Sequence, residues 1–515
     1  MLLKRIAYIV TGLTALSMSA QNPISPQGVY IADPTARVDS DGRLYIYGSL
    51  DESPDYYCSQ RYHVLSSSDL RQWTLHRDAF SWKNRLYAPD LIRRDSTYYL
   101  YFDDPQGHEF VASGSSPTGP FTHATRIDGP QQIDPNIFID DDGQAYYFWG
   151  QFAAKGAKMN ADMRTLDLTT LRDSIVTERD HHFHEGSYVV KRGPYYYFLF
   201  ADVSRRGRPT SLGYAMSTHP LGPYEYKGVI IDNYGCDPET WNNHGSLVEY
   251  RGRWYVLYHR SSHRSRTMRM ACIEPITFNA DGTINEVEMT SQGAAPPLDA
   301  FARTDAFRAC LMHGAAIEAS PQPSPKGEGE EAPPLPSPKE EGVPLAVAAP
   351  SPFLSPLRYA SKEARAGKDR GGTSSEAFGG ALSPSPFGEG WGEASGEAPT
   401  WALWRYLDFG RGARRLTLSV KAQAEGKIVV LADSLSGRCL GEISVQAQDG
   451  WQEVSMRIRK IRGVHALYLK FEPAATAWAH LMQRAAPSPY GEDRGGAPGE
   501  SAVWLHLNWF LFGKM

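Results

Sequence analysis

The stretch that decides the fold is QQIDPNIFIDDDGQAYYFWG, residues 131–150. An Asp-Pro pair that begins at Asp134 precedes a short apolar run, an acidic turn that ends at Gly143, and a run of aromatic residues. Earlier in the chain, IADPTARVDSDGRLYIYGS has an Asp-Pro pair that begins at Asp33, at the same distance from Gly42. Two copies of one spacing between a carboxylate and a turn glycine indicate a repeated structural unit.

The same pattern occurs five times, as DGRLYIYGS, DSTYYLYFD, DGQAYYFWG, RGPYYYFLF and RGRWYVLYH. Each copy has a turn residue, a tyrosine three positions on, and another large apolar residue two positions later. That spacing of two places both side chains on one face of a strand. The turn residues lie 47 to 59 residues apart, and such periods without helical patterning are typical of propeller blades. We therefore predict an all-β fold with a five-bladed β-propeller; an all-β sandwich with chance similarity among the segments is the alternative.

The starts of the five predicted blades contain the candidate catalytic residues. Eight or nine positions before the turn residues stand Asp33, Tyr87 or Ala88, Asp134, Glu185 and His244. The first strand of each blade lines the central axis, so these positions converge on one cavity. Three carboxylates in one pocket repel one another and their pKa values separate, as glycoside hydrolysis requires. The alternative is that the two aspartates cap turns and Glu185 lies on the surface.

Length and charge exclude some classes of function. At 515 residues the chain is too long for one ordinary core, and a net charge of −5 gives no reason to expect nucleic acid as a partner. The five cysteines are scattered, without a disulfide framework or zinc-ligand spacing.

The first twenty residues, MLLKRIAYIVTGLTALSMSA, have the anatomy of a secretory signal peptide. We therefore expect an exported protein, periplasmic or secreted, that is a monomer and is not held at a membrane after residues 1–20 are removed.

The C-terminal part of the chain changes character after the predicted propeller, which spans residues 22–296. Low-complexity inserts rich in Pro, Gly, Ser and Glu occupy about 320–398 and 484–500, and this composition predicts disorder. The rest of residues 298–515 alternates between apolar and polar side chains, which favours a β-sandwich of jelly-roll type.

Five segments resemble the blade-start motifs of family 43 glycoside hydrolases: ADPTARV, LYAPD, IDPNIFIDDDG, HEGSYVVKRGPYYYFLF and NHGSLVEYRGRWYVLYHR. The resemblance implies that Asp33 is the general base, Glu185 the general acid, and Asp134 a residue that tunes pKa and orients its neighbours. It also implies inversion at the anomeric carbon, with the acid and the base roughly 6.5–9.5 Å apart.

The same resemblance implies three further roles. His244 would lie near a bound Ca²⁺ at the propeller centre, through a water molecule; the residues alone equally allow a hydrogen-bonded structural histidine. Tyr87 and Arg260 resemble positions that contact the sugar, and their alternative is an ordinary place in a strand.

The sandwich resembles a family 6 carbohydrate-binding module through YLDFGRGA, GWQEVS and HALYLKFE. Trp404, Tyr406 and Trp451 are its candidate sugar-stacking residues, with core packing as the alternative for each. The last strand departs from the family pattern, because His506 stands where an asparagine often touches the sugar.

Together these features predict an exo-acting, inverting glycoside hydrolase that releases α-L-arabinofuranose from arabinoxylan or a related plant-wall polysaccharide. A β-D-xylosidase or an endo-arabinanase on the same fold is the first alternative. A non-catalytic sugar-binding propeller and a retaining fructan hydrolase are the others.

Overall fold

The computed structural model describes residues 21–205, 210–236, 242–262, 265–313, 316–317, 400–474 and 505–514. These described residues belong to one compact unit. The predicted signal peptide and the two low-complexity inserts lie outside the described residues.

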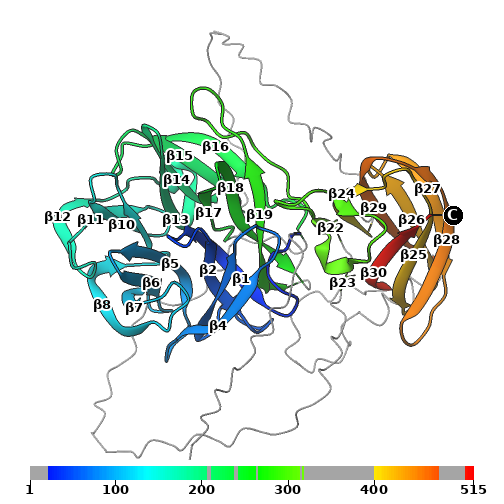
Figure 1. Ribbon diagram of the computed structural model, residues 1–515, viewed down its shortest axis with the longest axis horizontal. Coiled ribbons are helices and arrows are strands. Elements are labelled where there is room, and N and C mark those ends of the chain that lie inside the picture. Colours follow the sequence, from blue (N-terminus) through cyan, green and yellow to red (C-terminus); the bar gives the residue numbers. More distant parts are fainter. Residues whose placement is uncertain are drawn as a thin grey trace, which may run out of the picture. The chain divides into compact units, whose positions relative to one another are not determined.

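Five antiparallel sheets follow one another along the first part of the chain, coloured from blue to green in Figure 1. In each sheet, consecutive strands pair with one another. The first sheet is β1 (Tyr30–Val38), β2 (Leu44–Asp51), β3 (Arg61–Ser67) and β4 (Thr74–Ser81). The second is β5 (Tyr87–Arg94), β6 (Thr97–Asp103), β7 (His108–Gly114) and β8 (Thr122–Gln131). The third is β9 (Asn136–Ile139), β10 (Ala145–Trp149), β11 (Lys155–Met159) and β12 (Leu166–Arg172).

The last two sheets complete the propeller. After the short helix α1 (Glu178–His181), the fourth sheet is β13 (Phe183–Arg192), β14 (Tyr195–Asp202), β15 (Ser211–Ser217) and β16 (Glu225–Ile231). The fifth is β17 (Gly245–Tyr250), β18 (Arg253–Ser262) and β19 (Ser265–Ile276). The N-terminal residues run beside β19, where the Ile24 amide donates to the Ala271 carbonyl over 2.9 Å. The first strands contact one another in the order β1, β5, β9, β13, β17 and back to β1. The prediction of a five-bladed propeller is confirmed.

Asp90 in β5 forms hydrogen bonds that connect the first strands of neighbouring blades. Its carboxylate accepts hydrogen bonds from Thr35 Oγ1 over 2.8 Å, from Arg37 Nη2 over 2.7 Å, and from Asn136 Nδ2 over 2.7 Å. The Asn136 side-chain oxygen in turn accepts from the Val189 amide over 2.9 Å. Because these buried groups of Asp90 and Asn136 are hydrogen-bonded, much of the cost of burying polar contacts between the first strands is offset.

Bulges interrupt the first strands where they enter the central cavity. The register of β1 on β2 shifts between Ala32 and Thr35, and Asp33 has φ 50°. Asp134, just before β9, has φ 62°. In β13 the register shifts after Glu185, where Gly186 has φ 79°. Such bulges redirect single side chains, here those of residues at the blade starts.

The C-terminal β-sandwich has two sheets with an apolar core between them. One sheet contains β20 (Leu298–Asp299), β22 (Leu311–His313), β24 (Thr400–Asp408), β26 (Gly426–Ala432), β27 (Arg438–Val445) and β29 (Val464–Pro473). The other contains β21 (Thr304–Asp305), β23 (Ala316–Ile317), β25 (Ala413–Ala422), β28 (Gln452–Ile461) and β30 (Leu505–Gly513). The short 3-10 helix η1 (Ala306–Arg308) precedes β22. The prediction of a β-sandwich is confirmed. In the part of the chain that the structure describes, no helix has the length and apolar character needed to cross a membrane.

Candidate active site

Asp33 is a buried carboxylate held by a cation and a hydroxyl group. Arg269 Nη1 donates to Asp33 Oδ1 over 3.0 Å, and Ser49 Oγ donates to Asp33 Oδ2 over 2.6 Å. Burial is the largest single influence on Asp33 and opposes its ionisation. The charge of Arg269, the two nearby histidines and the Ser49 hydrogen bond together outweigh burial, so the pKa of Asp33 lies below its usual value. Asp33 is therefore an ionised carboxylate at neutral pH.

Arg269 itself is fixed by a second carboxylate. Its Nε and Nη2 donate to Asp51, over 2.9 and 3.0 Å. Both side chains are almost completely buried. A planar guanidinium can serve two carboxylates at once, which a point-charged lysine cannot do. The geometry of Asp33 thus depends on a buried Asp-Arg-Asp chain.

His259 in β18 completes the surroundings of Asp33. Its Nδ1 accepts the Asp33 backbone N–H over 3.0 Å, so this nitrogen carries no proton. Burial lowers the pKa of His259 to about 3, against the opposing charge of Asp33. The imidazole is therefore neutral and acts as an acceptor that holds the strained backbone of Asp33 in place.

Asp134 lies among acids rather than cations. Its Oδ2 accepts the Gly186 amide over 2.9 Å, and its own amide donates to Asp103 Oδ1 over 3.3 Å. Burial and the charges of Glu185, Asp103 and Asp33 raise the pKa of Asp134 well above its usual value. Asp134 thus holds a proton far more readily than Asp33 does.

Glu185 is half-buried at the start of β13. Gln151 Nε2 donates to its Oε2 over 2.8 Å. Burial raises the pKa of Glu185, and Asp33 adds to the rise, while His184, Gln151 and Arg269 oppose it. Of the three carboxylates at the blade starts, Asp33 is therefore biased towards ionisation, whereas Asp134 and Glu185 are biased towards their protonated forms. A proton acceptor and a proton donor in one pocket are what general acid–base chemistry requires.

A second acidic pair lies next to Asp134, and no repeat pattern in the sequence predicted it. Asp103 and Glu109 face each other across β6 and β7, and both are completely buried. Burial and their mutual repulsion raise the pKa of Asp103 well above its usual value. This neighbour raises the pKa of Asp134 in turn.

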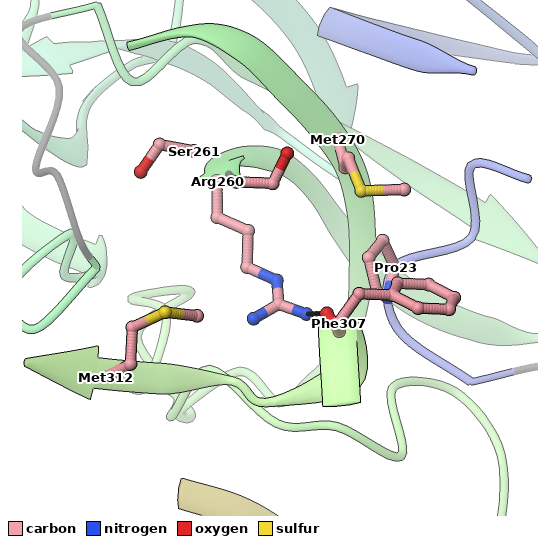
Figure 2. Close-up of a pocket in the computed structure, with 7 residues that line it drawn as sticks. Pro23, Arg260, Ser261, Met270, Phe307 and Met312 are labelled. Carbon is pink, nitrogen blue, oxygen red and sulfur yellow. Dashed lines mark hydrogen bonds between the residues drawn. The ribbon is translucent and has the colours of Figure 1, made fainter. Parts of the chain in front are cut away.

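The two predicted sugar-contacting residues occupy different places. Tyr87 is half-buried and pairs with Asp103 across β5 and β6, close to the acids. Arg260 lies on the opposite face of β18 from His259, because side chains alternate along a strand. Its Nη2 donates to the Phe307 carbonyl over 3.2 Å, and it lines a separate cavity (Figure 2). Arg269, rather than Arg260, is the arginine that the structure places beside Asp33.

His244 lies in the wall of the acid pocket. Its Nδ1 is 3.9 Å from Asp134 Oδ1, and its ring stands 3.1 Å from where a Cβ atom on Gly186 would lie. Ca²⁺ prefers six to eight oxygen ligands. Among the described residues, no three or more His, Cys, Asp and Glu side chains are grouped so as to hold a metal ion. The described side chains do not by themselves make a calcium site, and we assign no catalytic step to a metal.

The three aromatic candidates in the sandwich differ in exposure. Trp404 is completely buried and packs edge-on against Phe510, so it is a core residue and cannot stack on a sugar. Tyr406 is partly buried, and its hydroxyl donates to Glu288 Oε2 over 2.7 Å. Trp451 is 36% exposed, and of the three it alone presents a substantial open surface.

Comparison with known proteins gives two family matches. Residues 20–284 match the glycosyl hydrolases family 43, and residues 387–483 match the carbohydrate binding module (family 6). The first match spans more than half of the chain.

Three relatives are informative. A xylosidase/arabinosidase of Thermoclostridium stercorarium is 31% identical over 350 residues, which cover 56% of this chain and 72% of the relative. A beta-xylosidase of Xylanibacter ruminicola is 28% identical over 318 residues, covering 50% of this chain and 97% of the relative. An arabinoxylan arabinofuranohydrolase of Bacillus subtilis (strain 168) is 24% identical over 544 residues, covering 91% and 93%.

One solved structure is CoXyl43, a beta-xylosidase/alpha-arabinofuranosidase from a compost microbial metagenome, in complex with xylotriose and in calcium-free form. It is 29% identical, covers 53% of this chain and 98% of its own, and has a TM-score of 0.47. The acid pocket at the blade starts and the family match over the same residues lead to one conclusion: this chain belongs to family 43 of the glycosyl hydrolases and is a glycoside hydrolase that carries a family 6 carbohydrate-binding module.

Proposed function

We propose that the protein is an exo-acting, inverting hydrolase that releases α-L-arabinofuranose from arabinoxylan or a related plant-wall polysaccharide. The observation that carries the proposal is the opposite pKa direction of Asp33 and Glu185 within one pocket. A base biased towards its ionised form and an acid biased towards its protonated form are the pair that a single-displacement reaction needs.

In the proposed reaction, Asp33 takes a proton from a water molecule, and that water attacks the anomeric carbon. Glu185 gives its proton to the glycosidic oxygen as the bond to the leaving group breaks. Asp134 accepts the Gly186 amide and so fixes the backbone next to Glu185. Inversion requires space for the water, so we expect the Asp33 and Glu185 carboxyl groups to lie roughly 6.5–9.5 Å apart.

The choice of arabinose rests on the organisation of the chain. The arabinoxylan arabinofuranohydrolase of Bacillus subtilis aligns along 91% of this chain, including the appended module. The xylosidase relatives align with 56% and 50% of this chain, and β-D-xylosidase activity in the same pocket is the second candidate. Endo-arabinanase activity is the third.

The experiment that tests the substrate is a product analysis. Purified protein is incubated with 4-nitrophenyl α-L-arabinofuranoside, 4-nitrophenyl β-D-xyloside, wheat arabinoxylan and debranched arabinan, and the released sugars are identified. We expect arabinose from arabinoxylan. Xylose would assign the protein to the xylosidases, and oligosaccharides from debranched arabinan would assign it to the endo-arabinanases. Proton NMR of the first-formed anomer tests inversion.

The general-acid role is tested with Glu185→Gln. We expect turnover of arabinoxylan to fall by roughly 10³-fold, within the range of general acid catalysis. Hydrolysis of an aryl glycoside with a good leaving group should fall much less, because that leaving group needs little protonation. Equal losses on both substrates would contradict the assignment. The matched control is Glu249→Gln, which changes an exposed glutamate in β17.

Two further features belong to the proposal. We propose that residues 1–20 direct export, so the N-terminus of the protein recovered from a secreting host should begin near Gln21. We also propose that Ca²⁺ binds at the propeller centre near His244 through water. If so, chelation should lower the melting temperature, and added Ca²⁺ should restore it.

A further inference from the structure

A buried arginine outside the acid pocket faces a small cavity. The cavity has a volume of about 10 Å³ and is lined by residues of β18, β19 and the segment that follows the propeller. These residues are Pro23, Arg260, Ser261, Ser262, Met270, Phe307 and Met312. Figure 2 shows the Arg260 guanidinium extending between Met312 and Phe307. A cavity of this volume has room for about one water-sized species.

The Arg260 charge is poorly compensated. The side chain is only 3% exposed, and its one hydrogen bond to a backbone oxygen runs from Nη2 to Phe307. The Nε–H is buried and has no acceptor among the described residues. No described carboxylate forms an ion pair with Arg260, unlike Arg269, which has two carboxylate partners. A buried cation without a directly paired counter-charge is costly, and the cost falls when an anion is bound.

A second buried arginine increases the positive charge of this region. Arg308 is 8% exposed, and its Nη1 donates to the Gln21 carbonyl over 3.1 Å. Burial lowers the pKa of Arg308 to about 10; Asp305 opposes this fall, and the charge of Arg260 adds to it. The two guanidinium groups are thus close enough to repel each other.

The buried carboxylate of this region is already engaged. Glu274 accepts hydrogen bonds from Asn22 Nδ2 over 2.8 Å, from the Thr290 amide over 2.7 Å, and from Tyr258 Oη over 3.1 Å. Burial raises the pKa of Glu274 to about 8, so at neutral pH it carries less than a full negative charge. The charge of Arg260 opposes this rise, so Glu274 offsets the positive charge only in part, and one partial negative charge cannot neutralise two arginines.

From this geometry we propose that the Arg260 cavity binds a single halide ion, chloride under ordinary conditions. The Nε–H, unpaired within the described part of the chain, indicates a ligand that accepts a hydrogen bond. The two arginines favour a negative charge on that ligand, and the volume of the cavity restricts it to a monatomic ion. The flexible side chains of Met270 and Met312 can adjust to an ion slightly larger than water. A sulfate or a carboxylate is too large, and a water molecule would leave the charge uncompensated.

The first test is thermal unfolding of the full chain as sodium chloride replaces sodium gluconate at constant ionic strength. We expect the melting temperature to rise by roughly 2 °C or more as the site fills. Arg260→Met should abolish this chloride response, whereas Arg126→Met, which removes an exposed arginine from β8, should keep it. A response that is the same in all three proteins would be a general salt effect and would overturn the proposal.

The second test does not depend on a variant that folds. Crystals of the parent protein grown with sodium bromide are examined by anomalous scattering at the bromine absorption edge. A peak within hydrogen-bonding distance of Arg260 Nε supports the halide site. A cavity without anomalous signal, whether it is empty or contains water, overturns the proposal.

Discussion

The starts of blades one and three look the same in the sequence but differ in their electrostatics. Asp33 and Asp134 each precede a proline, lie nine residues before a turn glycine, and adopt a left-handed backbone conformation. Both are almost completely buried. Yet the pKa of Asp33 is lowered and that of Asp134 is raised well above its usual value.

The difference comes from neighbours that are distant in the chain. Asp33 receives a guanidinium from Arg269 in β19, whereas Asp134 has Glu185 and Asp103 nearby. Burial alone would disfavour the ionised form of both residues. Local sequence therefore sets where each carboxylate stands, and the charge brought by other strands decides whether it is ionised.

The largest expected effect comes from neutralising each carboxylate in turn. Asp33→Asn removes the ionised base, and we expect kcat to fall by roughly 10³-fold or more. Asp134→Asn should cost at most roughly 10²-fold, the size of a positioning defect, because Asp134 already favours its neutral form. Asp95→Asn, in an exposed turn, is the control for both. An equal loss in the two variants would show that the two carboxylates do not differ in role.

A smaller effect is expected when the pKa of Asp33 is raised towards that of Asp134 by changing Arg269. Arg269→Lys cannot serve Asp33 and Asp51 together, so the pKa of Asp33 should rise. At a given acidic pH more Asp33 is then protonated and unable to accept a proton from water. We expect the acidic limb of the kcat/KM profile to move up by roughly one pH unit.

The control for this shift is Arg126→Lys, which changes an exposed arginine in β8. A lower kcat/KM with an unmoved acidic limb would indicate a purely structural role for Arg269, and it would separate the cation from the ionisation of Asp33.

The smallest effect is expected from changing Asp103, the acid next to Asp134. Burial and Glu109 raise the pKa of Asp103, so the folded protein holds this proton more tightly than the unfolded chain. Stability is therefore present at acidic pH and is lost as pH rises from the unfolded pKa towards the folded one. Asp103→Asn removes this pH-dependent loss of stability. The amide oxygen of the new side chain can still accept the Asp134 N–H.

We expect Asp103→Asn to raise the melting temperature by roughly 2 °C at about pH 8 and to have little effect at about pH 4. Activity should change only a few-fold. A variant that is less stable than its parent at the higher pH would show that the Asp103 carboxylate is ionised and paired in the folded protein.

Much of the fold follows from patterns that the sequence repeats. The tyrosine three positions after each turn residue lies in the second strand of its blade, as in β2 for Tyr45 and β14 for Tyr196. The positions of Asp33, Asp134 and Glu185 follow from the same offset, and the structure brings these three residues together. One chain is enough to find these positions, because residues at the same distance from the turn residue of each blade lie at equivalent places in the propeller.

The sequence analysis missed residues that have no repeat offset. Arg269 and His259 come from the last blade and Gln151 from the loop after β10, and nothing in their local sequence connects them with the acids. Arg260 was predicted to contact the sugar, and the structure places it on the opposite face of β18 from His259, because adjacent strand residues face opposite sides. Trp404 shows the same limit, because an aromatic residue in a strand has the same pattern whether it faces a core or a sugar.

The sequence by itself determined the number of blades, the sandwich, and the three acids that meet at the blade starts, because periodic patterns of turns and apolar residues dictate strands and their order. Only the tertiary structure decided which acid is ionised, which arginine supports it, and which aromatic residue remains exposed. The physical reason is that a pKa and an exposed surface depend on neighbours in space. In this propeller other blades supply those neighbours, in one case from more than two hundred residues away in the chain, as Arg269 is from Asp33.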